Sequence, residues 1–489
     1  MPLLSSLIAA AFPNAQVVGN TAIAINHITT DSRAVKTGSL FAAMPGVAAD
    51  GAKYIPDALR AGASAVLMAA GSRADVVATV PVIRVKDMRA AVSALAAAFY
   101  PEQPKFCMAI TGTDGKTSTA DFVRQLAQLS GMDAASIGTL GLRSNRTAMD
   151  AKYPSINTSP EPILLHSMLQ ELALSGVTVA AIETSSHGLE QKRADGVKFC
   201  AAAFTNLTRD HLDYHGTLEA YFAAKARLFN TVLGEESLAV INRDDAHFAA
   251  LKTICDARRV RVISFGASAD ADYRVVKVTP HANGLDATLV LNGKIHEISL
   301  PLYGAFQLSN MLAAIGLLQG AGLVVDALVK LLPRLLGVPG RLEKIAAYNG
   351  APIFIDYAHT PAALENILKT LRPHTQSKLH VVFGCGGDRD AGKRPEMGAV
   401  ASAFADHVVV TDDNPRSENA AAIRAAIMAK AASAVEVEGR DRAIVTAIQQ
   451  LQAGDVLVVA GKGHETTQII GNQAHPFSDA EHIRKAVAA

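Results

Sequence analysis

The sequence predicts an α/β protein with more than one domain, and three observations lead to this prediction. With 489 residues, the chain is longer than one hydrophobic core normally supports. In its last third, strand-like apolar runs alternate with helix-spaced segments, as they do in a doubly wound sheet. Near residue 110, an apolar run leads into a glycine-rich loop and then a helix-spaced segment, which is the layout of a phosphate-binding loop.

Two stretches rich in proline or glycine divide the chain into three predicted domains. Tyr100–Pro104 is polar and holds two prolines, and Gly337–Gly340 reads GVPG. We therefore predict domains at residues 1–100, 101–337 and 338–489.

Composition excludes several classes of function. Hydrophobic residues make up 49% of the chain and charged residues 19%, and the net charge of +1 gives no electrostatic reason to expect a nucleic acid or an anionic membrane as partner. The four cysteines form no C-x-x-C pair. No uncharged apolar run reaches the ~18 residues of a membrane span, and Leu3–Phe12 lacks the preceding basic residues of a signal peptide. We expect a soluble cytoplasmic protein with no nucleic-acid or membrane partner.

The predicted phosphate loop, TGTDGKT at residues 111–117, follows the apolar run Phe106–Ile110. Its glycines let backbone N–H groups close on phosphate oxygens, and the following helix adds a partial positive charge at its N-terminus. Lys116 would meet the phosphates and Thr117 would hold Mg²⁺. Because Ile110 stands where the commonest phosphate loop has glycine, an ordinary glycine-rich turn is the alternative interpretation.

Three further features lie in the segment after this loop. A buried-type strand, Ala180–Ile182, ends at Glu183, where an Mg²⁺ ligand would belong beside a phosphate loop, although a helix cap or a surface ion pair is the alternative. Residues 205–216, TNLTRDHLDYHG, concentrate polar side chains after another apolar stretch, with no zinc-type spacing. Lys225 lies in an amphipathic helical stretch and, taken alone, would be interpreted as an exposed surface lysine.

In the last segment, four strand-like runs each lead into a polar loop. The loops are residues 356–361, 384–390, 411–416 and 461–465. Because ligands of open α/β sheets bind outside the carboxyl ends of the strands, we expect these loops to converge on one site. Charged loops without a function are the alternative.

Together these motifs resemble the Mur ligases, the ATP-dependent amide-bond ligases of peptidoglycan precursor synthesis. The resemblance spans nearly the whole chain and rests on TGTDGKTS, TNLTRDHLDYHG, YFAAKARLF, LYGAFQLSNMLAA, GVPGRLE, DYAHTP, GCGGDRDAGKRP and GKGHE. Within the family, TDDNPRSE resembles the members that add meso-diaminopimelate, because lysine-adding members lack the arginine that stands here as Arg416.

The resemblance implies an N-terminal domain for a UDP moiety, a central P-loop ATPase sheet and a C-terminal Rossmann-like doubly wound domain for the incoming amino acid. The implied substrates are UDP-MurNAc-L-Ala-D-Glu, meso-diaminopimelate and ATP, with Mg²⁺ as cofactor and a monomer as the expected state. ATP would be bound by Gly112, Thr113, Asp114, Gly115, Lys116, Thr117, Ser118, Asn310, Arg341 and Asp356. The UDP-linked substrate would be bound by Ser32, Asn157, Thr158, Ser159, Ser185, Gln191 and Arg193. Diaminopimelate would be bound by Arg389, Asp413, Asn414, Arg416, Gly461 and Glu465.

The implied catalytic residues are Lys116, His211, Lys225 and His359, and the implied Mg²⁺ ligands are Thr117, Glu183, His211 and Lys225. Lys225 matches the family lysine that becomes carbamylated with CO₂, which turns an ammonium into an anion able to approach Mg²⁺. Either His211 or His359 could take the proton of the attacking amine, and the sequence does not choose between them.

Two positions depart from the family pattern without removing a group that the chemistry needs. Asp114 stands where many members have asparagine, and the proline frequent downstream of DNPR is absent after Glu418. Three other functions stay open: a lysine-adding ligase, which Arg416 disfavours; a folylpolyglutamate synthetase, which the long N-terminal domain disfavours; and a nucleotide-dependent switch without ligase activity, which the Lys225 motif and the C-terminal loops disfavour.

Overall fold

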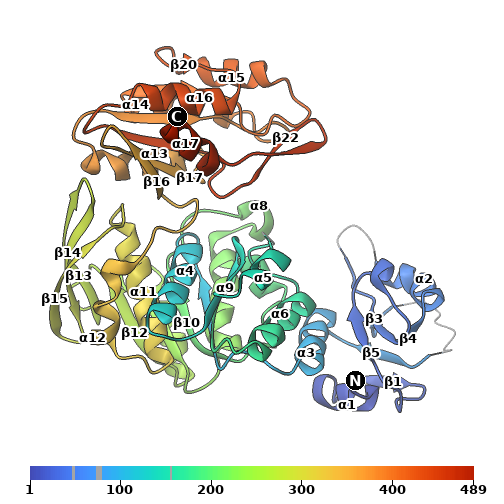
Figure 1. Cartoon of the computed structure of the whole chain (residues 1–489). Coiled ribbons are helices and arrows are strands. Elements are labelled where there is room, and N and C mark those ends of the chain that lie inside the picture. The colour runs from blue at the N-terminus through green and yellow to red at the C-terminus, as the bar shows by residue number, and fades with distance from the viewer. Residues whose placement is uncertain (47–49, 73–79, 155–156) are drawn as a thin grey trace. The chain divides into compact units, whose positions relative to one another are not determined.

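The computed structural model describes residues 1–46, 50–72, 80–154 and 157–489, and it confirms the predicted α/β class (Figure 1). The chain forms two compact units. One comprises Met1–Phe265 and Ala313–Val324, and the other comprises Gly266–Leu312 and Val325–Ala489. No helix in these ranges is long and apolar enough to cross a membrane.

The first unit begins with a five-stranded sheet of order β1-β5-β4-β3-β2, which is parallel except for β1. Its strands are β1 (Gln16–Val18), β2 (His27–Thr29), β3 (Ser39–Ala42), β4 (Ala63–Ala69) and β5 (Val82–Val85). Its helices are α1 (Leu4–Ala11), α2 (Ile55–Arg60) and α3 (Met88–Phe99). Alternate strand residues such as Leu40, Leu67 and Ile83 are buried in one core with α1 and α3.

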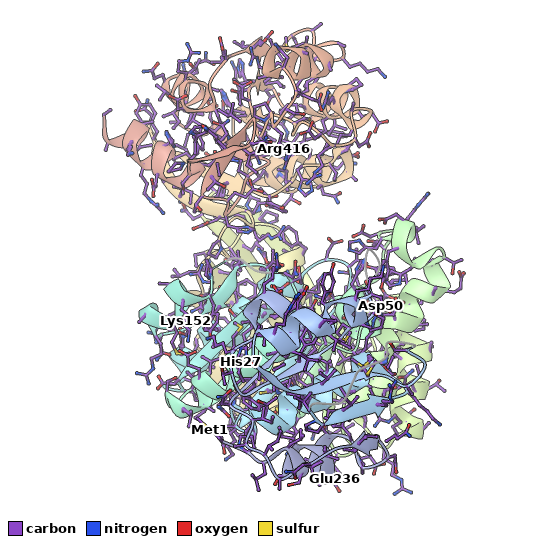
Figure 2. The ribbon with its side chains drawn as sticks, turned by 90° about the vertical axis from the view of Figure 1, so that its right-hand side faces the viewer. Met1, His27, Asp50, Lys152, Glu236 and Arg416 are labelled. Atoms are coloured by element: carbon purple, nitrogen blue, oxygen red, sulfur yellow. The ribbon has the colours of Figure 1, made fainter. Side chains whose placement is uncertain are left out.

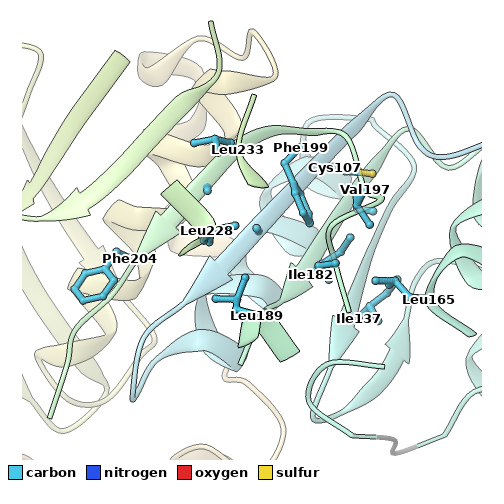
Figure 3. Close-up of a cluster of buried hydrophobic side chains, with 14 of the residues drawn as sticks. Cys107, Ile137, Leu165, Ile182, Leu189, Val197, Phe199, Phe204, Leu228 and Leu233 are labelled. Atoms are coloured by element: carbon cyan, nitrogen blue, oxygen red, sulfur yellow. The ribbon is translucent and has the colours of Figure 1, made fainter. Parts of the chain in front are cut away.

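The same unit holds the central sheet, whose strands run in the order β12-β11-β10-β6-β9-β7-β8 and are parallel except for β8. The strands are β6 (Phe106–Thr111), β7 (Ala134–Gly138), β8 (Gly141–Arg143), β9 (Val179–Glu183), β10 (Phe199–Phe204), β11 (Leu238–Asn242) and β12 (Arg261–Gly266). The helices are α4 (Lys116–Leu129), α5 (Thr147–Lys152), α6 (Pro162–Leu174), α7 (Ser186–Glu190), α8 (Leu212–His215), α9 (Leu218–Arg227) and α10 (Phe248–Ala257). Ile182 of β9 and Phe204 of β10 lie in its core, part of which Figure 3 shows.

The second unit contains an antiparallel meander and a six-stranded sheet of order β16-β17-β21-β18-β19-β20, parallel except for β16. The meander strands are β13 (Tyr273–His281), β14 (Gly284–Leu291) and β15 (Lys294–Leu300). The sheet strands are β16 (Glu343–Tyr348), β17 (Ala351–Asp356), β18 (Leu379–Phe383), β19 (His407–Val410), β20 (Val435–Glu436) and β21 (Val456–Ala460), and β22 (Thr467–Ile470) pairs with β23 (Gln473–Pro476). Helices α12 (Val325–Val329), α13 (Pro361–Leu371), α14 (Lys393–Phe404), α15 (Ala420–Met428), α16 (Arg440–Gln449) and α17 (Asp479–Ala488) belong to this unit. The residues of α11 (Phe306–Gly320) are divided between the two units after Leu312.

Candidate active site

The predicted phosphate loop connects β6 to α4, as expected from its sequence. Gly112 and Gly115 both have positive φ angles, 149° and 82°, and Gly115 is the residue before the first turn of α4. A Cβ atom on Gly112 would lie 1.9 Å from the Thr205 hydroxyl oxygen, so the loop has no space for a side chain there. The Lys116 ammonium donates hydrogen bonds to the carbonyls of Gly112 (3.0 Å) and Thr113 (2.7 Å), and it therefore lies over the loop.

A second segment, Thr205–Thr208, forms a wall against the phosphate loop, and the sequence did not assign Thr205 or Asn206 a role. Asn206 accepts the Thr113 N–H on its carbonyl and the Asp114 N–H on its side-chain oxygen, both at 2.9 Å. The Thr205 hydroxyl donates to the Asp114 carbonyl at 2.6 Å. These bonds fix the loop backbone, whose N–H groups would surround a phosphate. Their donors and acceptors lie more than 90 residues apart in sequence, so local pattern could not reveal them.

Glu183 ends β9, as predicted, and it contacts Thr117. The Thr117 hydroxyl donates to the Glu183 carboxylate at 2.9 Å, and Thr139, which the sequence analysis missed, donates its N–H to the same carboxylate at 2.9 Å. A Cβ on Gly138 would lie 2.0 Å from this carboxylate, so the glycine leaves it room. Carboxylate and hydroxyl oxygens suit Mg²⁺, which keeps several waters and phosphate oxygens as its other ligands. In the described ranges no group of three or more His, Cys, Asp or Glu side chains is arranged to hold a metal, so a magnesium ion here would depend on such added ligands.

His211 lies in a group of aromatic rings that includes His187 of α7 and Tyr221 of α9. It precedes α8 with a φ of 52°, and its ring is about half exposed. Its ring centre lies 4.9 Å from that of His187 and 6.0 Å from that of Tyr221. Burial, and then the neighbouring His211, lower the pKa of His187. No sequence motif assigned His187 a role.

Lys225 is buried, so its interpretation as a surface lysine is wrong. Only 1% of the residue is exposed, and its ammonium nitrogen donates to the Gly112 carbonyl at 2.7 Å. The same nitrogen lies 4.4 Å from the centre of the Tyr221 ring, one turn earlier on α9. Burial is the main cause, and Lys116 the second, of a pKa lowered to about 6. An amine that is mostly unprotonated at neutral pH lies directly against the phosphate loop.

Four of the residues predicted for the UDP-linked substrate lie together beside Glu183. The Ser159 hydroxyl lies 3.1 Å from the Ser185 hydroxyl, Arg193 donates to the Ser159 carbonyl at 2.8 Å, and Arg193 also contacts Gln191. Gln191 lines a cavity of about 330 Å³ together with Arg89 and Val92 of α3 and with Thr30, which follows β2. The other three predicted residues lie at an exposed position (Asn157), at hydrogen-bond distance from Thr139 (Thr158) and in the 3₁₀ turn Ser32–Ala34 (Ser32).

In the second unit, the residues predicted to bind the nucleotide lie at two places, near the end of β17 and on α11. Asp356 ends β17 and accepts the N–H groups of Leu342 (2.7 Å) and Ala358 (2.8 Å), and burial raises its pKa. The Arg341 guanidinium lies 5.1 Å from the centre of the Tyr357 ring. His359 is exposed, with its Nδ1 atom 2.8 Å from the Tyr357 carbonyl. Asn310 is buried on α11 and donates to Gln307 at 3.2 Å.

The C-terminal loops converge, as predicted, around a residue that the sequence analysis did not select. Lys462 is fully buried, and its ammonium donates to the side chains of Asn414 (2.9 Å) and Glu465 (3.2 Å). It also lies 3.5 Å from the Asp413 carboxylate. The available signal in the sequence was a lysine between two glycines at the end of a buried strand.

Arg416, which Figure 2 labels, joins the loop after β19 to the loop after β18. Its guanidinium donates to the Gly387 carbonyl at 2.8 Å, and its backbone has a φ of 51° and bonds to Ile469 and Gly471. Arg389 is exposed and donates a long hydrogen bond, 3.4 Å, to the Asp388 carbonyl. Behind the loops, Arg440 and Asp479 form an ion pair at 2.7 Å in which neither side chain is exposed, and Arg440 also donates to the Ala460 carbonyl at the end of β21.

Comparisons with known proteins agree with this arrangement. Residues 24–100 match the model of the Mur ligase family, catalytic domain, residues 110–318 match the Mur ligase middle domain, and residues 340–463 match the Mur ligase, glutamate ligase domain. A UDP-N-acetylmuramoyl-L-alanyl-D-glutamate--2,6-diaminopimelate ligase of Brucella melitensis is 48% identical over 96% of this chain and 95% of its own. A ligase of the same name from Rhizobium meliloti is 47% identical over 99% of both. A solved structure with that name superposes over 100% of this chain and 99% of its own, with a TM-score of 0.75 and 33% identity.

Proposed function

The chain belongs to the Mur ligase family, and we propose that it adds meso-diaminopimelate to UDP-MurNAc-L-Ala-D-Glu in peptidoglycan precursor synthesis, with ATP as the energy source. The observation that carries the proposal is identity of 48% to a ligase named for this reaction over 96% of the chain, which includes both the phosphate loop and the C-terminal loops. The proposal includes the domain spans 1–100, 101–337 and 338–489, a cytoplasmic location and a monomeric state.

The first step is phosphoryl transfer from ATP to the D-glutamyl carboxylate, which makes a poor electrophile reactive. The backbone N–H groups of the phosphate loop and the Lys116 ammonium orient the γ-phosphate and stabilise its developing charge. Mg²⁺, held by Glu183 and Thr117 with His211 nearby, would neutralise further phosphate charge. The product is an acyl phosphate and ADP.

Lys225 acts in this step as its carbamate. Only an unprotonated amine reacts with CO₂, and the lowered pKa of Lys225, about 6, keeps the amine unprotonated at neutral pH. A buried anion beside the Gly112 carbonyl would need a cation, which supports a magnesium ion at this place.

The second step is attack of the diaminopimelate amine on the acyl phosphate. The loops around Lys462 hold the amino acid, and Arg416 binds its distant carboxylate through two parallel hydrogen bonds. The tetrahedral intermediate loses phosphate and leaves the amide. His211 or His359 takes the proton that the attacking amine gives up.

Phosphate release tests the proposal directly. The enzyme is incubated with ATP and Mg²⁺, with UDP-MurNAc-L-Ala-D-Glu or without it, and with meso-diaminopimelate, L-lysine or neither. We expect rapid phosphate release and an amide product only when the UDP-linked substrate and meso-diaminopimelate are both present. Equal release without either substrate would identify a plain ATPase, and faster release with lysine would identify a lysine-adding ligase.

Titration of Mg²⁺ tests the metal role of His211. The His211→Ala variant should need several times more Mg²⁺ for its half-maximal rate, because one nearby ligand is lost. Identical Mg²⁺ curves for the variant and the wild type would remove His211 from the metal site.

A further inference from the structure

The loop that follows β11, residues 243–247, contacts the wall segment Thr205–Thr208, and no motif assigned it a function. The Asp245 carboxylate accepts the N–H of Leu207 at 2.7 Å and the N–H of His247 at 2.8 Å. Its other contact is the His247 ring, whose Nδ1 atom lies 2.9 Å away. Only 6% of the Asp245 side chain is exposed, so these bonds are the means by which its buried charge is satisfied.

Asn242, the last residue of β11, holds the other end of the same wall segment. Its side-chain amide donates to the Thr205 carbonyl at 2.7 Å, and its side-chain oxygen accepts the Asp244 N–H at 2.9 Å. Asn242 and Asp245 therefore fix the backbone on both sides of Asn206. Asn206 is the residue that accepts the N–H groups of Thr113 and Asp114 in the phosphate loop.

His247 extends the contact to the helix that carries Lys225. Its ring stacks on Phe222 of α9, with ring centres 4.5 Å apart and planes 26° apart. Phe222 lies one turn before Lys225, and the neighbouring Tyr221 hydroxyl lies 3.2 Å from the Thr113 hydroxyl. The Asp245–His247 pair thus touches the two elements, the wall segment and α9, that pack against the phosphate loop.

We propose that Asp245, supported by Asn242 and His247, is a positioning residue for nucleotide binding, acting through Leu207 and Asn206 on the backbone N–H groups of the phosphate loop. A displacement of about 1 Å in such donors can cost on the order of a hundredfold in rate. The proposal rests on the nucleotide-binding part of the proposed function and not on the identity of the amino acid. Loss of Asp245 should weaken nucleotide binding and leave the amino-acid site in the second unit unaffected. A residue that merely stabilises the fold would not show this difference.

Four variants test the proposal by direct calorimetric binding of ATP with Mg²⁺, which requires no ligase substrate. Asp245→Ala should weaken ATP binding about tenfold, which is the scale of one lost charge-assisted hydrogen bond. Asp245→Asn keeps one oxygen for the Leu207 N–H and should weaken binding only a few-fold. His247→Phe keeps the stack on Phe222 and should stay within about twofold. Asp256→Ala removes an exposed acidic residue of α10 that pairs with Lys252, and it should match the wild type.

Kinetics with all substrates supply the second measurement, and circular dichroism checks the fold of each variant. We expect a raised KM for ATP and an unchanged KM for the amino acid. Wild-type ATP affinity in folded Asp245→Ala would overturn the proposal, as would a loss of kcat or thermal stability with every KM unchanged. If Asp245→Ala does not fold, wild-type ATP affinity in Asp245→Asn overturns it. If the wild type binds ATP but forms no amide, the proposed ligase function fails while the binding comparison still decides the role of Asp245.

Discussion

The phosphate loop of the first unit and the C-terminal loops of the second both lie at the carboxyl ends of parallel strands, yet they are built differently. The phosphate loop is shaped by glycines with positive φ and by main-chain hydrogen bonds to Asn206. The C-terminal loops are held by the buried ammonium of Lys462, which contacts the Asn414 side chain and the carboxylates of Asp413 and Glu465. A main-chain site needs exact backbone placement, whereas a site of buried charges depends on each side chain keeping its partner.

The largest effect on activity is expected at Lys225, which is a buried charge-bearing residue and also lies beside the phosphate loop. Lys225→Ala should lower kcat by about 10³-fold, the scale of removing one preorganised electrostatic group. Formate or acetate in the buffer should restore part of the rate by replacing the carbamate. Lys369→Ala, which alters an exposed lysine paired with Glu365, is the control. Turnover like the wild type in Lys225→Ala would show that the amine is dispensable.

The next largest effect concerns Arg416 and the choice of amino acid. Arg416→Ala should lower kcat/KM for meso-diaminopimelate by about 10²-fold or more and for lysine little, because lysine lacks the distant carboxylate. Arg389→Ala is the matched comparison, since Arg389 is exposed and should matter less. A ratio of the two kcat/KM values that does not change in Arg416→Ala would place selectivity elsewhere.

Lys462 tests whether buried charges hold the second site together. Lys462→Met leaves Asp413 and Glu465 without their cation, and breaking such a buried pair costs about 3–5 kcal/mol of unfolding free energy. Urea unfolding should show this loss, the KM for diaminopimelate should rise about tenfold, and the dissociation constant of ATP should not change. The exposed Lys485→Ala serves as control. Unchanged stability together with unchanged KM would mean that the loops do not depend on Lys462.

The smallest effect is the contribution of Lys225 to the pH dependence of the unfolding free energy, measured in CO₂-free buffer. Its pKa falls from the ordinary 10.5 to about 6 on folding, mainly through burial. Between these values the unfolded chain binds more protons at this residue than the folded chain does, so unfolding free energy rises with pH, by at most ~1.4 kcal/mol per pH unit. Lys225→Met should remove this part of the slope. Parallel stability curves for both proteins between pH 7 and 9 would contradict the shift.

The sequence predicted the elements better than the contacts between them. The strand before Gly112, the strand ending at Glu183 and the four C-terminal loops followed from apolar runs and glycines, because those signals are local. The burial of Lys225 and the bonds of Thr139 and Asn206 were not predicted, because they depend on neighbours brought close by parallel pairing. Thr139, for example, reaches Glu183 across 44 positions of sequence. Only the family resemblance singled out Lys225 in advance.

The buried ion pair of Arg440 and Asp479 determines how mutations that shorten the chain near α17 should affect the protein. Asp479 is the first residue of α17, and its carboxylate is the partner of a guanidinium that no solvent reaches. A nonsense or frameshift mutation just upstream of its codon would leave the Arg440 guanidinium next to the end of β21 without its carboxylate partner. Truncations that remove Asp479 should therefore behave as loss-of-function alleles, whereas truncations beginning beyond Ile483, a buried apolar residue of that helix, should be tolerated far better.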